Sequence, residues 1–161
     1  YTTFGAGVAV PGTGISLQNR GANFSLDPAS DNCLAGGKKS YHTIIPGFLL
    51  KDGGAVGPFG VMGAFMQPQG QTEVLVNTLD YHMNPQEALD APRIQWIGGR
   101  KLELEREAGE AIADELRAMG HEVTVVDDRI SMGRGQIIWR GEDGVYTAGT
   151  EPRCDGAVAA W

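Results

Sequence analysis

Two short segments combine residue types that could take part in catalysis. The first, residues 60–68 (GVMGAFMQP), runs from the end of a predicted strand into a predicted helix through small residues. The small side chains of Gly63 and Ala64 would let consecutive backbone N–H groups face a ligand, which is how an oxyanion hole is built. The pattern alone favours the simpler interpretation, in which these residues only make a tight turn.

The second segment, residues 18–24 (QNRGANF), gathers polar side chains directly after a short predicted strand at residues 15–18. Polar side chains in this position could bind a ligand. Here too the pattern alone favours the simpler interpretation, a solvated loop that extends over residues 19–39. Loops of this length in compact domains are usually functional or disordered.

Other motifs that would indicate a particular reaction are absent from the sequence. It has no P-loop, no HExxH, no CxxC and no Ser in a GxSxG turn. His42, His82 and His121 are too scattered to indicate a zinc site, and we expect no metal and no cofactor. From residue patterns alone, the chain is a soluble α+β domain without a visible nucleophile.

The composition limits the classes of partner. The length of 161 residues, with 42% hydrophobic, suits one domain with a core. A net charge of −7 argues against nucleic acid, because phosphates would be repelled, and no apolar run is long enough to span a membrane. Cys33 and Cys154 are too few for a disulfide framework, so we expect free thiols. The chain opens on Tyr1 without an initiator Met, as a processed or fragmentary chain does, and its first residues carry no information about compartment.

Apolar spacing and turn residues predict the elements that would position these segments. Residues 43–50 and 55–62 predict a β-hairpin. Residues 69–83 predict a helix, and Asn84, Pro85 and Glu87 predict the start of a second one that ends before Pro92. The remainder predicts a helix at residues 107–119 and strands at residues 93–97, 101–105, 122–126, 135–140 and 145–149. This mixture predicts an α+β fold, with helices packed on an antiparallel sheet.

Six segments resemble the γ-glutamyltranspeptidases, and specifically the small-subunit portion of that family. They are residues 2–7 (TTFGAG), 12–15 (GTGI), 17–20 (LQNR), 60–69 (GVMGAFMQPQ), 84–93 (NPQEALDAPR) and 151–156 (EPRCDG). The matches run in order across nearly the whole chain. Residues 1–161 are therefore identified as a single domain, the C-terminal, small-subunit part of such an enzyme.

The resemblance implies an N-terminal-nucleophile (Ntn) hydrolase fold, a four-layer αββα sandwich with mostly antiparallel sheets. A precursor of this kind cleaves itself to expose a Thr, whose α-amino group acts as general base while the hydroxyl forms an acyl-enzyme. In the family that Thr precedes the segments matched here, so Thr2 and Thr3 are not the nucleophile and this chain alone is expected to be inactive. Gly63 and Ala64 match the Gly-Gly pair of the family's oxyanion hole.

The resemblance also assigns five substrate-binding positions. Asn23 stands where the family has an Asp that binds the substrate's α-amino group. Arg20 occupies a position where the family usually has Gln, and Tyr1 occupies one where it usually has Asn or Glu. His42 and Thr43 stand on a Ser-Ser pair that holds the α-carboxylate. An Asn in place of Asp removes the charge that would pair with an ammonium group.

The predicted function is therefore that of a γ-glutamyltransferase-like amidohydrolase or acyltransferase, in a branch that resembles cephalosporin or glutaryl acylases. The implied partners are the large subunit of the same precursor and a small-molecule γ-glutamyl or glutaryl amide. The alternative is a catalytically silent fragment, or a non-enzymatic binding paralogue of the same fold.

Overall fold

The computed structural model describes Tyr1 and residues 4–161, in two units, Tyr1–Thr43 and Ile44–Trp161. Thr2 and Thr3, which the family resemblance excludes as the nucleophile, lie outside the described residues. The described residues of the first unit are mostly irregular and form one 3-10 helix, η1 (Arg20–Asn23), and two isolated bridges, Ala9–Ser16 and Ser25–Cys33.

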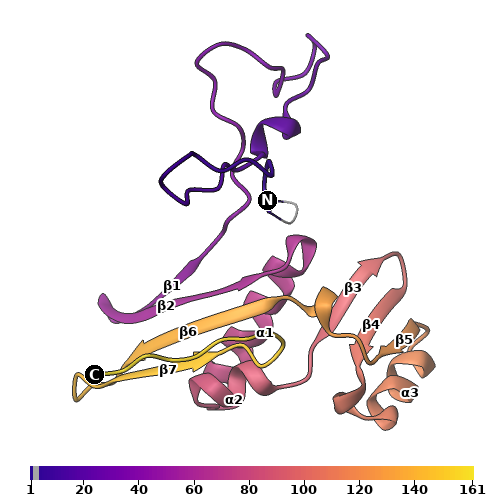
Figure 1. Cartoon of the computed structure of the whole chain (residues 1–161). Coiled ribbons are helices and arrows are strands. Elements are labelled where there is room, and N and C mark those ends of the chain that lie inside the picture. Colours follow the sequence, from indigo (N-terminus) through magenta and orange to yellow (C-terminus); the bar gives the residue numbers. More distant parts are fainter. Residues whose placement is uncertain (2–3) are drawn as a thin grey trace. The chain divides into compact units, whose positions relative to one another are not determined.

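The second unit contains a four-stranded antiparallel sheet in the order β1-β2-β6-β7 (Figure 1). Its strands are β1 (Gly47–Lys51), β2 (Gly54–Met62), β6 (Arg134–Arg140) and β7 (Tyr146–Thr150). β1 and β2 form the predicted hairpin. In the two central strands, β2 and β6, Phe59 lies opposite Ile137. Met62 lies opposite Arg134, and these are the last paired residues of the two strands.

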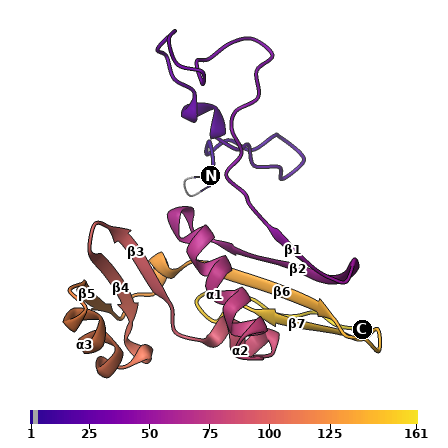
Figure 2. The same ribbon diagram turned by 180° about the vertical axis from the view of Figure 1, so that it is seen from behind.

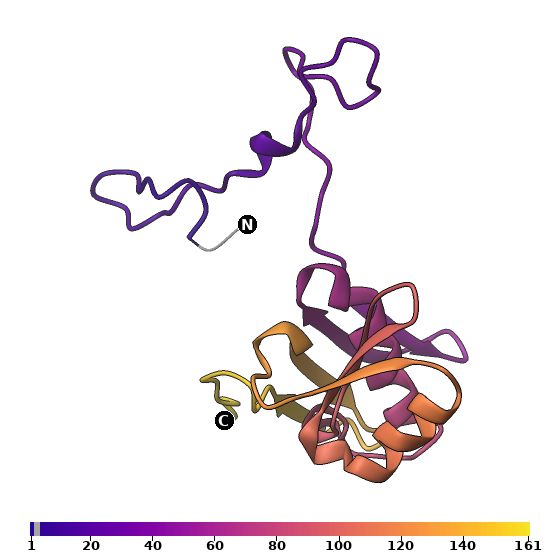
Figure 3. The ribbon, with the colours of Figure 1, turned by 90° about the vertical axis from the view of Figure 1, so that its right-hand side faces the viewer.

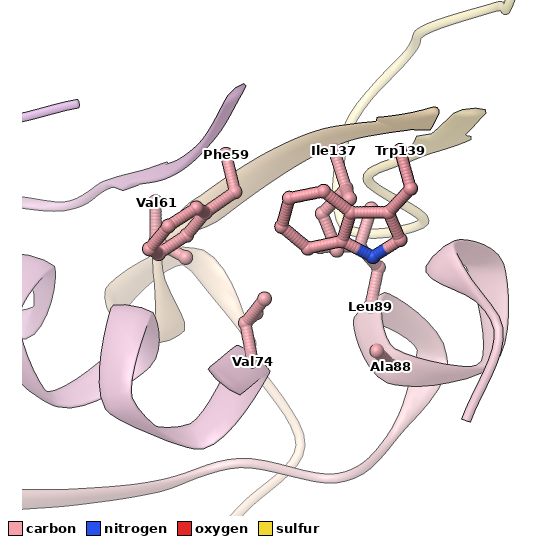
Figure 4. Close-up of a cluster of buried hydrophobic side chains, with 7 residues drawn as sticks. All are labelled: Phe59, Val61, Val74, Ala88, Leu89, Ile137 and Trp139. Atoms are coloured by element: carbon pink, nitrogen blue, oxygen red, sulfur yellow. The ribbon is translucent and has the colours of Figure 1, made fainter. Parts of the chain in front are cut away.

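Helices α1 (Gln67–Leu79) and α2 (Pro85–Asp90) cover one face of this sheet (Figures 1 and 2). Side chains alternate between the two faces of a strand, so every second residue of β2 and β6 points toward the helices. The buried cluster between the layers consists of Phe59, Val61, Val74, Ala88, Leu89, Ile137 and Trp139 (Figure 4). On the opposite face, Phe48 and Ile138 are 58% and 42% exposed.

The start of α2 follows the prediction from its sequence. Asn84 Oδ1 accepts hydrogen bonds from the N–H groups of Gln86 and Glu87, at 2.9 and 3.0 Å. Glu87 Oε2 in turn accepts from the Asn84 N–H at 2.9 Å, which completes a capping box. With Pro85 at the first helical position, local residues account for this helix start.

A smaller sheet, in the order β3-β4-β5, completes the second unit. Its strands are β3 (Ile94–Gly98), β4 (Lys101–Glu105) and β5 (Glu122–Val126), and α3 (Glu110–Ala118) connects the last two (Figure 3). β3 and β4 are antiparallel, whereas β4 and β5 are parallel, which a helical crossover permits. The α+β class with mostly antiparallel sheets is confirmed. Among the described residues, no helix is long and apolar enough to cross a membrane.

Candidate functional site

The turn at Gly63 and Ala64 follows the last paired residue of β2. A short 3-10 helix, η2 (Ala64–Met66), begins immediately and leads into α1. These two N–H groups come after the strand ladder and before the first helical turn, where backbone donors have no partner within the element. Within the described part of the chain, no hydrogen bond from either N–H is found, and Ala64 is exposed.

Ala64 has a φ of 51°, the left-handed conformation that disfavours any side chain with a Cβ. Residues held in such conformations concentrate at functional sites. A Gly, the residue that the family resemblance implies at this position, would adopt positive φ without this penalty. The turn in this chain therefore keeps its geometry against a backbone penalty of about 1–2 kcal/mol.

The turn rests on a second backbone turn at Met132 and Gly133. A Cβ added at Gly63 would lie 2.8 Å from the Cα of Gly133 and 3.2 Å from the Cβ of Met66, so the two backbones touch. Gly133 has a φ of 78°, and a Cβ there would lie 2.9 Å from the carbonyl oxygen of Met62. Met66 and Met132 are fully buried beside this contact. The position of Gly133 thus limits where Gly63 can lie.

A buried charge cluster lies behind the second turn, and sequence patterns did not indicate it. Arg93, Glu105 and Glu151 are each at most 2% exposed, and the Arg153 side chain is equally buried. Arg93 Nη2 pairs with Glu151 Oε2 at 2.9 Å, and Arg153 Nη1 pairs with Glu151 Oε1 at 2.7 Å. Arg153 Nε also donates to Glu105 Oε1 at 2.6 Å. The only sequence signal for the cluster was that both arginines fall within matched family segments.

The two arginines of the cluster also bind backbone carbonyl groups. Arg93 Nη1 donates to the carbonyl oxygens of Met132 and Gly133, at 2.9 and 3.2 Å. Arg153 donates to the carbonyl oxygens of Leu89 and Ala91, at 2.8 and 3.0 Å, where α2 ends. The cluster therefore joins chain segments that are far apart in sequence.

Burial and pairing shift the pKa values of this region in different directions. Burial, and then the neighbouring Arg153, lower the pKa of Arg93 from its ordinary value. Burial also acts to lower the pKa of Arg153, but its hydrogen bonds to Glu105 and Glu151 outweigh that effect and raise it. Burial raises the pKa of Glu73, on α1, to about 7. Glu73 Oε1 accepts from the Ile94 N–H at 3.2 Å, and within the described residues its buried Oε2 has no partner.

The five predicted substrate-binding residues all lie in the first unit, and Arg20 brings two of them together. Arg20 Nε donates to Thr43 Oγ1 at 2.9 Å, and the guanidinium lies 5.4 Å from the centre of the Tyr1 ring. Asn23 ends the same 3-10 helix, and its buried Nδ2 finds no acceptor among the described residues. His42 is exposed, next to Thr43.

Gly63 and Ala64 belong to the second unit, whereas the five predicted substrate-binding residues belong to the first. Neither Gly63 nor Ala64 carries a group that exchanges protons, and two consecutive N–H donors with no other hydrogen bond among the described residues are suited to stabilise a negatively charged oxygen. In the part of the chain that the structure describes, no group of three or more His, Cys, Asp or Glu side chains could hold a metal ion.

A family model described as Gamma-glutamyltranspeptidase matches residues 1–161. The glutathione hydrolase-like YwrD proenzyme of Bacillus subtilis is 38% identical, over 98% of this chain and 31% of that protein. The oxamate amidohydrolase proenzyme of Klebsiella pneumoniae is also 38% identical, over 100% of this chain and 32% of that protein. The crystal structure of the cephalosporin acylase from Bacillus halodurans is 59% identical, with a TM-score of 0.85, over 98% of this chain and 30% of that chain. The chain thus spans about a third of the length of these relatives.

Proposed function

Because this chain belongs to the γ-glutamyltranspeptidase family, we propose that the complete protein is an Ntn amidohydrolase or acyltransferase in which this chain supplies the oxyanion hole. The observation that carries the proposal is the pair of N–H groups at Gly63 and Ala64, which follow the end of β2 and make no other hydrogen bond among the described residues. A peptide-bond carbonyl under attack becomes an oxyanion, and such donors stabilise it more than they stabilise the substrate.

The nucleophile in this proposal is an N-terminal Thr outside these 161 residues, as in the family. Its α-amino group takes the hydroxyl proton as the oxygen attacks the amide carbonyl. It then gives that proton to the amine, which leaves as the C–N bond breaks and the acyl-enzyme forms. The acyl group next passes to water or to a second amine, and the Thr hydroxyl regains its proton. The chain purified by itself should therefore not hydrolyse γ-glutamyl-p-nitroanilide in multiple turnovers.

The proposed partner is the large subunit of the same precursor. The sheet face opposite α1 and α2 carries exposed apolar side chains, among them Phe48 on β1 and Ile138 on β6, the two strands that flank β2. A sheet with one such face left open is typical of a surface that another layer covers. Two of the relatives above are named as proenzymes, in keeping with a chain that is one product of a longer precursor.

The proposed substrate is an amide of a carboxylic acid that lacks the α-ammonium group, such as a glutaryl amide. Asn23 carries no charge to pair with an ammonium group, and the Arg20 guanidinium, held by Thr43 and Tyr1, disfavours a cation nearby. A charge-assisted hydrogen bond to an Asp would contribute about 1.5–3 kcal/mol, or about 10–150-fold in affinity.

The experiment compares kcat/KM for glutaryl- and γ-glutamyl-p-nitroanilide in the complete protein and in its Asn23→Asp variant. We expect the wild-type protein to prefer the glutaryl substrate, and the variant to shift the ratio toward the γ-glutamyl substrate by about 10-fold or more. Asn84→Asp is the matched control, because it adds the same charge at a helix N-cap, where Asp and Asn serve equally well.

Two results would contradict this proposal in different ways. The wild-type protein could show a strong γ-glutamyl preference that Asn23→Asp leaves unchanged. That result would mean that position 23 does not determine recognition of the ammonium group. A complete protein that hydrolyses neither substrate nor other acyl amides would favour the catalytically silent paralogue instead.

A further inference from the structure

The buried guanidinium of Arg93 and the Gly63–Ala64 turn are joined by an unbroken series of contacts. Glu151 Oε2 holds Arg93 Nη2, and it also accepts the Gly135 N–H at 2.6 Å, at the start of β6. Arg93 Nη1 holds the carbonyl oxygens of Met132 and Gly133. Gly133 in turn is in contact with the backbone of Gly63, as the 2.8 Å from its Cα to an added Cβ indicates.

We propose that Arg93, anchored by Glu151, is a positioning residue for the oxyanion hole, because it fixes the Met132–Gly133 turn against which Gly63 lies. This inference rests on the proposed function, since it concerns the same N–H groups. Arg93 is 2% exposed and therefore cannot touch a substrate. It acts through Gly133, and the property it controls is the direction of the Gly63 and Ala64 N–H groups.

The choice of Arg at this position is explained better by positioning than by stability. A buried ion pair is weak evidence for stability, because apolar residues of the same volume often serve as well or better. A guanidinium differs from them in presenting several donors in one rigid plane. Here that plane holds two successive carbonyl oxygens on one nitrogen and a carboxylate on the other, which neither an apolar side chain nor a Lys ammonium reproduces.

Ala64 supplies an independent reason for such a support. Its φ of 51° is unfavourable for Ala, so the turn would relax toward another conformation unless neighbouring structure held it. Gly133 approaches so closely that a Cβ there would meet the Met62 carbonyl at 2.9 Å. The backbone on this side of the turn therefore has no room to move while the Met132–Gly133 turn keeps its place.

The test uses the complete, self-processed protein and the variants Arg93→Lys and Glu151→Gln, assayed with glutaryl-p-nitroanilide well below their melting temperatures. Arg93→Lys keeps the positive charge but loses the planar set of guanidinium donors. Glu151→Gln keeps the shape of the side chain but removes the charge that pairs with Arg93. We expect kcat to fall by about 10- to 100-fold while KM stays nearly unchanged, since a misplacement of about 1 Å costs on that order in rate and the donors act in the transition state. Arg106→Lys is the control, because Arg106 forms an exposed ion pair with Asp127 and should leave both constants unchanged.

A double-mutant cycle separates positioning from general destabilisation. In a Gly63→Ala background the turn is already displaced by the contact with Gly133, so Arg93→Lys should there reduce kcat much less than it does in the wild type. Full additivity of the two losses would overturn the inference. A folded Arg93→Lys protein with wild-type kcat would overturn it too. The same holds if the only change is a lower melting temperature or an altered KM.

Glu151→Gln decides the question if Arg93→Lys does not fold, since wild-type kcat in that variant would equally overturn the inference. An inactive wild-type protein would instead overturn the proposed function, and the inference with it. An active wild type with unaffected variants would overturn the inference alone.

Discussion

Glu73 is expected to make the stability of this protein depend on pH, and Glu73→Gln should remove that dependence. Burial raises the pKa of Glu73 from 4.5 to about 7. A carboxyl group whose pKa is higher in the folded state binds its proton more tightly there, so its contribution to stability is fully present below pH 4.5 and is lost as the pH rises through 7. Each pKa unit corresponds to 1.36 kcal/mol, so the total change is about 3 kcal/mol, of which about 2.5 kcal/mol falls between pH 5 and pH 8.

The assay is urea unfolding of the complete protein and of its Glu73→Gln variant at several values between pH 5 and pH 8. A Gln at this position keeps the oxygen that accepts the Ile94 N–H and cannot ionise. The variant should therefore gain stability over the wild type as the pH rises, by about 2.5 kcal/mol across this range. Glu115→Gln, on the exposed side of α3, is the matched control and should follow the wild-type profile.

Two results would refute the reasoning. The first is a difference in unfolding free energy between wild type and Glu73→Gln that stays constant from pH 5 to pH 8. That result would mean that the carboxyl group of Glu73 ionises equally easily in the folded and unfolded chain. The second is a difference of the opposite sign, which would mean that the charged form is stabilised by Arg93 and Arg153 more than burial destabilises it.

Changes at the turn and at the helix cap give three further expected outcomes. Ala64→Gly should raise the free energy of unfolding by up to about 1 kcal/mol, because relief of the positive φ outweighs the added entropy of the unfolded chain. The variant should keep its kcat because the N–H remains, and a lower urea midpoint would contradict this prediction. Gly63→Ala should lower kcat by about 100-fold, because its Cβ forces the turn away from Gly133, and steady-state kinetics on a folded variant with wild-type kcat would rule that out. Asn84→Ala should lower the free energy of unfolding by about 1 kcal/mol through loss of the capping box, as thermal unfolding can measure, with kcat unaffected.

The elements of the second unit could be predicted because their signals are local. A capping box, a proline at the first helical position and strict alternation in a strand are each set by residues within a few positions of one another. The prediction of a helix start at Asn84 is confirmed to the residue, and the hairpin of residues 43–62 is confirmed with β1 shorter than expected at its N-terminal end. The parallel pairing of β4 with β5 was not predicted, because the direction of a strand depends on the path of the helix between them.

Motifs along the chain were enough to predict the family, the α+β class and the turn that carries Gly63 and Ala64. Three features could not be predicted in this way: the positive φ at Ala64, the contact between Gly63 and Gly133, and the cluster of Arg93, Glu151 and Arg153. Arg93 and Glu151 are 58 residues apart, and nothing in their local sequence distinguishes a buried charge from an exposed one. Charged side chains are ordinarily exposed, so their burial depends on partners and backbone carbonyls that folding alone brings together.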